Sequence, residues 1–134
     1  YSTDSGVTWK NCGQDVTASR SDTRLALDFG GSRLYLATPG QGMLISTDNC
    51  RSWQASNEGL SNLFVNTLAI DPNNPETIYA GTDGGAYISY DNGATWGQVN
   101  DGLLGATVVY SIAVDKNGNV YAATPYGVFK LESK

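Results

Sequence analysis

The chain has 134 residues, a length that suits one domain. It carries 8 Lys and Arg against 13 Asp and Glu, a net charge of −5 at pH 7, and this argues against nucleic-acid binding, which needs a basic face. Histidine is absent, so Ser-His-Asp and Cys-His catalysis within the chain are excluded, and two cysteines are too few for a metal framework. No apolar run approaches the roughly 18 residues of a membrane span, and no cofactor is expected.

The first element is an eight-residue motif, STDSGVTW, at residues 2–9. Near-copies occupy residues 46–53 (STDNCRSW) and 89–96 (SYDNGATW). A motif that recurs about every 43 residues marks a repeat architecture, which has to be recognised before single elements are assigned. We call these three stretches the box segments.

Between the box segments, short apolar runs rich in β-forming residues recur with the same period. Six of them are 25–28 (LALD), 34–38 (LYLAT), 68–71 (LAID), 78–82 (IYAGT), 112–115 (IAVD) and 120–124 (VYAAT). Gly42, Gly85 and Gly127 each begin a third run, and a fourth run follows each box tryptophan. Pro, Asn, Asp and Gly separate the runs, and no segment has helical periodicity. Each repeat therefore predicts four strands of about 4–7 residues.

Four short antiparallel strands per repeat of this length indicate blades of a β-propeller. We expect an all-β fold with about three blades and a single domain spanning residues 1–134. The repeats are expected at about 10–53, 54–96 and 97–134, with residues 1–9 supplying the box segment and outer strand of a terminal blade.

The box segments suit a tight turn between the third and fourth strands. Their Asp accepts hydrogen bonds from backbone N–H groups ahead of it, the following Gly adopts a positive φ, and the Trp buries its ring. The pattern Ser-x-Asp-x-Gly-x-Thr-Trp resembles the Asp-box, or BNR repeat, of sialidases, sortilin-type receptors, xyloglucan-hydrolysing enzymes and photosystem assembly factors. That resemblance implies a structural role, on the face away from any active or binding site, for Asp4, Gly6, Trp9, Asp48, Trp53, Asp91, Gly93 and Trp96.

The second box segment has Cys50 where the others have Gly6 and Gly93. The other cysteine, Cys12, follows the first box segment. Two readings stay open: a disulfide between neighbouring blades, or two unpaired thiols. A disulfide would place the protein in an oxidising compartment, and we expect it to be secreted, periplasmic or extracellular.

The first and last repeats predict an assembly. The run GVFKL (residues 127–131) matches a third strand without a following box segment, whereas residues 1–10 supply a box segment and outer strand without a blade. Either the chain is a segment of a longer propeller, or copies join head to tail by exchanging this strand. A homodimer of six blades is the favoured self-assembled form.

Few residues suit catalysis. The arginines Arg20, Arg24, Arg33 and Arg51 occupy non-equivalent repeat positions and suit surface charges better than a carboxylate site. Acids that do not repeat are the better candidates for glycoside hydrolysis by paired carboxylates. They are Asp22, Asp83 and Asp101, with Asp83 first because it lies between a second and a third strand.

Ligand binding is expected where the loops between second and third strands meet the connections between blades. Five residues there are bulky or polar and are not repeated: Gln41, Phe64, Asp83, Leu104 and Tyr126. Aromatic and amide side chains suit contacts to sugars or peptides. The sequence therefore favours a non-enzymatic scaffold that binds a protein or a glycan, with a sialidase- or xyloglucanase-like hydrolase as the alternative.

Overall fold

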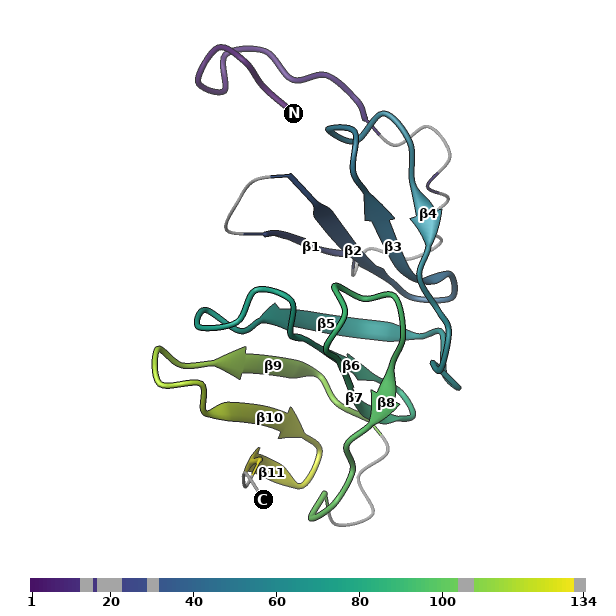
Figure 1. Cartoon of the computed structure of the whole chain (residues 1–134), viewed down its shortest axis with the longest axis vertical. Coiled ribbons are helices and arrows are strands. Elements are labelled where there is room, and N and C mark those ends of the chain that lie inside the picture. The colour runs from purple at the N-terminus through teal and green to yellow at the C-terminus, as the bar shows by residue number, and fades with distance from the viewer. Residues whose placement is uncertain (13–15, 17–22, 29–31, 104–107, 132–134) are drawn as a thin grey trace.

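The computed structural model is a fan of three antiparallel β-sheets (Figure 1) and describes residues 1–12, 16, 23–28, 32–103 and 108–131. The first sheet has the order β1 (Arg24–Leu27), β2 (Leu34–Thr38), β3 (Gly42–Ser46), β4 (Gln54–Ala55). The second has the order β5 (Val65–Ile70), β6 (Ile78–Thr82), β7 (Gly85–Ser89), β8 (Gly97–Gln98). The third contains β9 (Ser111–Val114), β10 (Val120–Thr124) and β11 (Gly127–Lys130).

The expected all-β propeller architecture is confirmed, because each sheet is a meander of consecutive antiparallel strands, as in a propeller blade. The predicted strand length is wrong for the outer strands, since β4 and β8 have only two residues each. In the third box segment, backbone N–H groups bond to the side chains of its own Asp and Ser, and pairing starts only after the Trp.

The central strand of the second sheet explains how the sheets stack. All five residues of β6 are buried, because both faces of this sheet are covered by neighbours. Successive side chains of a strand point to opposite faces. Accordingly, Ile78 and Ala80 pack between the first and second sheets, whereas Tyr79 packs between the second and third.

We call the first of these interfaces the first seam and the other the second seam. The first seam is centred on Tyr35, Met43, Tyr87 and Trp96, all nearly inaccessible to solvent. Burying a large apolar side chain stabilises a fold by about 1.5–3 kcal/mol, so these residues hold the first two sheets together. At Gly81, an added Cβ would lie 2.6 Å from side-chain atoms of Thr67 and Val109, so this glycine lets the strands of two sheets approach closely.

The antiparallel order of the strands sorts the loops into two groups. The second and third box segments each join the third strand of a sheet to the fourth, and both lie at one end of the strands, here called the box end. The turns β2–β3, β6–β7 and β10–β11 lie at the opposite end, together with the connections into β5 and β9. We call this second group the loop end.

Candidate functional site

The box turns share one hydrogen-bond pattern. In the third, the Asp91 carboxylate accepts bonds from the Thr95 backbone N–H at 2.9 Å, the Thr95 hydroxyl at 2.6 Å and the Ser89 hydroxyl at 2.7 Å. The Thr95 hydroxyl, the Thr95 backbone N–H and then the Ser89 hydroxyl hold the pKa of Asp91 at about 2. All of these bonds favour the ionised carboxylate.

The other two box aspartates are held in the same way. Asp4 accepts bonds from the hydroxyl and backbone N–H of Thr8, and Asp48 accepts the equivalent pair from Ser52. These bonds also lower the pKa of each carboxyl group to about 2. Because these hydrogen bonds lie within the box turns, the three carboxylates stabilise their own turns.

The box tryptophans connect each blade to the one before it. Trp96 Nε1 donates to the Ser56 carbonyl oxygen at 2.9 Å, and Trp53 Nε1 donates to the Cys12 carbonyl oxygen at 3.2 Å. Both acceptors come three residues after the preceding box tryptophan. Trp9, in the first box segment, is instead 76% exposed.

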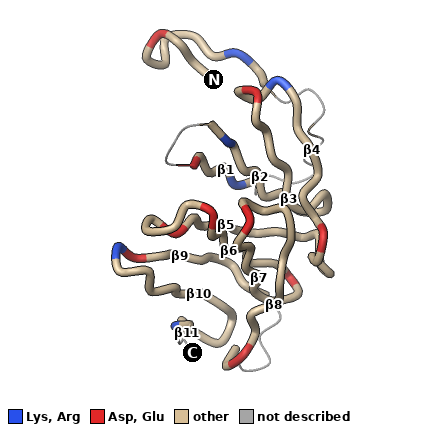
Figure 2. The backbone as a smooth tube through the Cα atoms, in the orientation of Figure 1, with Lys and Arg blue, Asp and Glu red and all other residues tan. Residues whose placement is uncertain are grey.

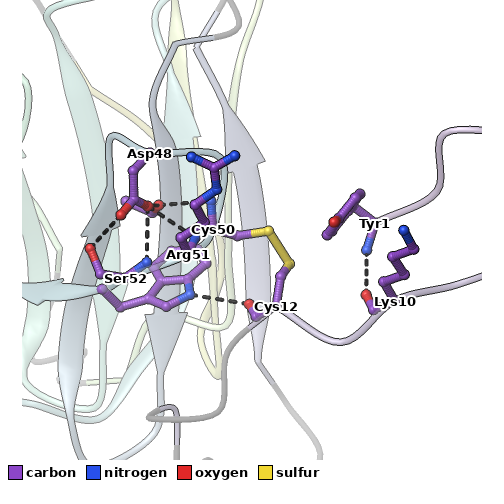
Figure 3. The surroundings of a disulfide bond; sticks show 9 residues. Tyr1, Lys10, Cys12, Asp48, Cys50, Arg51 and Ser52 are labelled. Carbon is purple, nitrogen blue, oxygen red and sulfur yellow. Dashed lines mark hydrogen bonds between the residues drawn. A yellow bond between two sulfur atoms is a disulfide. The ribbon is translucent and has the colours of Figure 1, made fainter.

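Cys12 and Cys50 form a disulfide (Figure 3), with Cα atoms 5.2 Å apart. Cys50 has a φ of 61°, close to the positive φ of Gly93, so the cysteine keeps the backbone shape of the turn. In the next box segment the same place carries a hydrogen bond, donated by the Ser56 hydroxyl to the Gly93 carbonyl. The disulfide is thus the covalent counterpart of a hydrogen bond that joins the following pair of blades.

At the loop end, the structure brings three of the sequence-predicted residues into one continuous surface. The β2–β3 turn, which contains Gln41, is tied to the connection into β5 by bonds from Gly40 and Gly42 N–H to the Leu63 carbonyl. Pro39 and Phe64 form an isolated bridge. Phe64 then accepts a bond through its carbonyl from the Asp83 N–H at 3.0 Å.

Asp83 is held by an amide that the sequence analysis missed. Asn66 Nδ2 donates to Asp83 Oδ1 at 2.8 Å and to the Val109 carbonyl at 3.2 Å, which links the β6–β7 turn to the connection into β9. Asn66 occupies no repeated motif, so nothing in the sequence marked it. The Asn66–Asp83 pair brings carboxylate and amide groups together, and the Asp83 backbone N–H is bonded to the carbonyl of the exposed Phe64.

A fourth residue predicted for this site, Tyr126, lies in the β10–β11 turn. It is 70% exposed and makes its backbone bond locally, to the Thr124 hydroxyl. Leu104 lies outside the described residues. The exposed Tyr110, at the connection into β9, was missed because the sequence analysis chose Leu104 from the same connection.

The charged residues lie mainly in turns (Figure 2), and no described strand contains Asp or Glu. Arg33 Nη1 donates to Asn92 Oδ1 at 3.0 Å, a contact between the first sheet and the third box segment. Asp101 borders a groove in the second seam. Arg20 and Asp22 lie outside the described residues.

Over the described parts of the chain, no group of three or more His, Cys, Asp or Glu is arranged to hold a metal ion. The same residues include no helix long and apolar enough to cross a membrane.

Comparison with known proteins finds a local match to a family model and a shared fold. The family described as "Two component regulator propeller" matches residues 102–126. No curated protein matches the chain.

Several solved structures are similar. A GH74 enzyme of Niastella koreensis has a TM-score of 0.67 and 23% identity over 81% of this chain and 19% of its own. The GH74 xyloglucanase of Xanthomonas campestris has a TM-score of 0.69 and 19% identity over 81% and 20%. An extracellular domain from B. thetaiotaomicron, described as part of a hybrid two component system, has a TM-score of 0.65 and 20% identity over 89% and 16%.

These identities establish the fold alone. The chain spans about a fifth or less of the length of each of these structures, a coverage that fits consecutive blades of a larger propeller. The three stacked meanders and these similarities lead to one conclusion: the chain consists of blades of a β-propeller.

Proposed function

We propose that the chain is a non-enzymatic binding scaffold that recognises a protein or a glycan through its loop end. The observation that carries this proposal is that bonded loops bring Phe64, Asp83 and Asn66 together at the loop end, where Tyr110, in the connection into β9, and Tyr126, in the β10–β11 turn, also expose their rings. Flat aromatic rings offer faces for stacking, and amide and carboxylate groups supply directional hydrogen bonds.

The alternative is part of a carbohydrate-active hydrolase. It is favoured by the likeness of the fold to two GH74 enzymes, one of them named as a xyloglucanase. Asp83 is the candidate acid. Its Oδ1 accepts a bond from Asn66, and a partner carboxylate would have to come from elsewhere on the loop end.

We further propose that the three box segments are Asp-boxes of the BNR type, and that the protein resides outside the cytoplasm. The first proposal rests on the shared bonding of Asp4, Asp48 and Asp91. The second rests on the Cys12–Cys50 disulfide, because such bonds persist in oxidising compartments.

A carbohydrate screen tests the function. The chain is assayed for binding to an array of oligosaccharides that includes xyloglucan fragments, and for release of reducing sugar from xyloglucan. Phe64→Ala and Tyr126→Ala should each weaken glycan binding at least about tenfold. Tyr90→Ala is the matched control, because this similarly exposed tyrosine lies at the box end.

The outcomes separate the two functions. Binding without sugar release supports the scaffold. Release of sugar that is lost in Asp83→Asn supports the hydrolase instead. Binding that is unchanged in Phe64→Ala and Tyr126→Ala would rule out the loop end as the recognition surface.

A further inference from the structure

The second seam contains a groove of about 640 Å³. Its walls are mostly apolar and come from both sheets, and they include Ile88, Val99, Leu103, Phe129 and Leu131. The first seam, between sheets of the same design, is closed by a tightly packed core.

Residues at equivalent positions of the repeats show which side chain fills the first seam. Leu103 and Phe129 occupy the repeat positions of Leu60 and Tyr87, which pack around Trp96 in the first seam. The groove thus has the lining that surrounds a box tryptophan elsewhere in the same chain. A surface built like this one fits the indole ring of a box segment.

Two equivalent glycines support the same conclusion independently. A Cβ on Gly59 would lie 2.1 Å from the Trp96 carbonyl oxygen, so the backbone of the third box segment packs directly on this glycine. A Cβ on Gly102, its repeat equivalent beside the groove, would meet no described atom within 4 Å. The wall of the groove therefore has room for the backbone of a box segment as well as for its ring.

Of the three box tryptophans, Trp9 is the most exposed, whereas Trp96 is buried in the first seam and Trp53 is partly buried beside Cys12. The turn at residues 2–9 has the same Asp-centred bonds as the other two, yet Trp9 is 76% exposed. Residues 1–12 lie at one end of the fan and β11 at the other (Figure 1), so this segment and the groove of the same chain are far apart.

We propose that the groove binds the box segment of residues 2–9 from a second copy of this chain, with Trp9 filling it. By analogy with Trp96 and Trp53, Trp9 Nε1 donates to the carbonyl of Val99, which comes three residues after Trp96. The residues after Trp9 pair with the outer edge of β11. This inference does not depend on the proposed function of the loop end.

The same head-to-tail arrangement would also bring together the exposed apolar faces of β1 and β11. Leu25 and Leu27 are exposed on β1, whereas their repeat equivalents Leu68 and Ile70 pack in the first seam. On β11 the exposed Val128 is equivalent to Ala86, which is buried in the second seam. Head-to-tail stacking of two copies would cover both apolar faces.

The repeat positions of Cys12 and Cys50 indicate which residues to replace by cysteine in a cross-linking test. Cys12 follows one box tryptophan by three residues, and Cys50 lies in the next box segment. If the proposal is right, Val99 and the Gly6 of a second copy have this same relationship. The variant Gly6→Cys/Val99→Cys should therefore form a disulfide between chains and run mainly as a covalent dimer on a non-reducing gel, whereas each single variant should not.

The first seam, which is already filled by packed side chains, supplies a matched control. In the chain, Ser56 and Gly93 have the same relationship, and a Cβ on Gly93 would lie 3.3 Å from Ser56 Oγ. Ser56→Cys/Gly93→Cys should form a disulfide within one chain. If this control cross-links while Gly6→Cys/Val99→Cys stays monomeric, or bridges within one chain, the proposal is overturned.

Light scattering on the otherwise unmodified chain gives a second test. The chain should have the mass of two copies, and Trp9→Ala should weaken self-association at least about 30-fold, as expected for a tryptophan at the centre of an interface. Phe64→Ala, which removes an exposed ring in the connection into β5, away from the groove and from β11, should have no effect. A monomeric wild-type chain, or a dimer indifferent to Trp9→Ala, would contradict the proposal.

Discussion

Asp91 lies at the surface, and its side chain caps a backbone N–H group of its own turn. Its carboxylate lies in an exposed turn but accepts bonds from one backbone N–H and two hydroxyls. Residues that cap backbone N–H groups with a side-chain oxygen are worth about 1 kcal/mol each at helix ends. The same physics applies to a turn that connects two strands.

Replacing this carboxylate should therefore destabilise the fold without altering the loop end. Asp91→Ala is expected to lower the free energy of unfolding by about 1–2 kcal/mol, measured by denaturant titration. Glu76→Ala, a nearby acid outside the box turns, serves as the control. Full stability with lost ligand binding would assign the box turns to recognition instead.

The three depressed pKa values also predict an acid dependence. The pKa of each box carboxyl is about 2 in the folded chain, below its ordinary value of 3.8. The folded state therefore binds protons less readily than the unfolded state, and stability falls as the pH drops from about 4 toward 2.

Thermal unfolding between pH 5 and pH 2 measures this effect. The melting temperature of the wild-type chain should decline over the lower half of that range. Asp91→Asn should start lower and decline less steeply, because one of the three groups no longer titrates. Parallel curves for the two proteins would contradict the contribution of Asp91.

At the scale of elements, the disulfide connects the first box segment to the first sheet. It closes a loop with a sequence separation of 38, and a cross-link of this span restricts the unfolded chain by about 2–4 kcal/mol. Trp53 Nε1 also donates a hydrogen bond to the Cys12 carbonyl oxygen, so the disulfide and this hydrogen bond both fix the chain at Cys12.

Restoring the common motif tests this contribution. Cys12→Ser/Cys50→Gly recreates the Ser and Gly found at Ser56 and Gly93, and it should be less stable than the oxidised wild type by about 2–4 kcal/mol. Adding a thiol reductant should lower the unfolding midpoint of the wild type and leave that of the variant unchanged. Equal midpoints for oxidised wild type and variant would show that the hydrogen bond alone suffices.

The elements were predictable to the extent that the repeat encodes them. The runs 34–38 and 78–82 coincide with β2 and β6, because apolar residues buried on both faces leave a clear pattern. The outer strands came out too long in the sequence analysis, because β4 and β8 pair with β3 and β7 over only two residues each. Pairing of Cys12 with Cys50 could not be decided from two cysteines, because it depends on how blades stack.

At the scale of the whole molecule, the two seams differ in how fully they are closed. The first contains Trp96, only 5% exposed, while the second contains the groove. The third sheet has three described strands against four in the others. Local opening requires little free energy where few apolar contacts are lost.

Amide hydrogen exchange should show this difference. In the Trp9→Ala chain, held dilute to limit self-association, β10 and β11 should exchange faster than β6 and β7. In the wild-type chain at high concentration, β11 should gain protection if a second copy pairs with it. Equal exchange in all three sheets of the Trp9→Ala chain would contradict the weaker closure of the second seam.

The loop end was harder to predict than the blades. Gln41, Phe64 and Asp83 were selected because the repeat places their loops at one end, and the backbone bonds bring those loops together. Asn66 was missed, because its bond to Asp83 joins residues 17 apart that share no motif. Such contacts depend on the twist and spacing of blades, which a repeat pattern does not specify.

The bond between Cys12 and Cys50 also turns part of the backbone into a closed covalent ring. A single peptide-bond cleavage between these two residues opens the ring but leaves both pieces attached through sulfur. A protease that nicks the chain there would therefore release no fragment until the sulfur–sulfur bond is reduced. In surroundings rich in proteases and poor in thiols, the first blade and its box segment would remain one molecule after being cut.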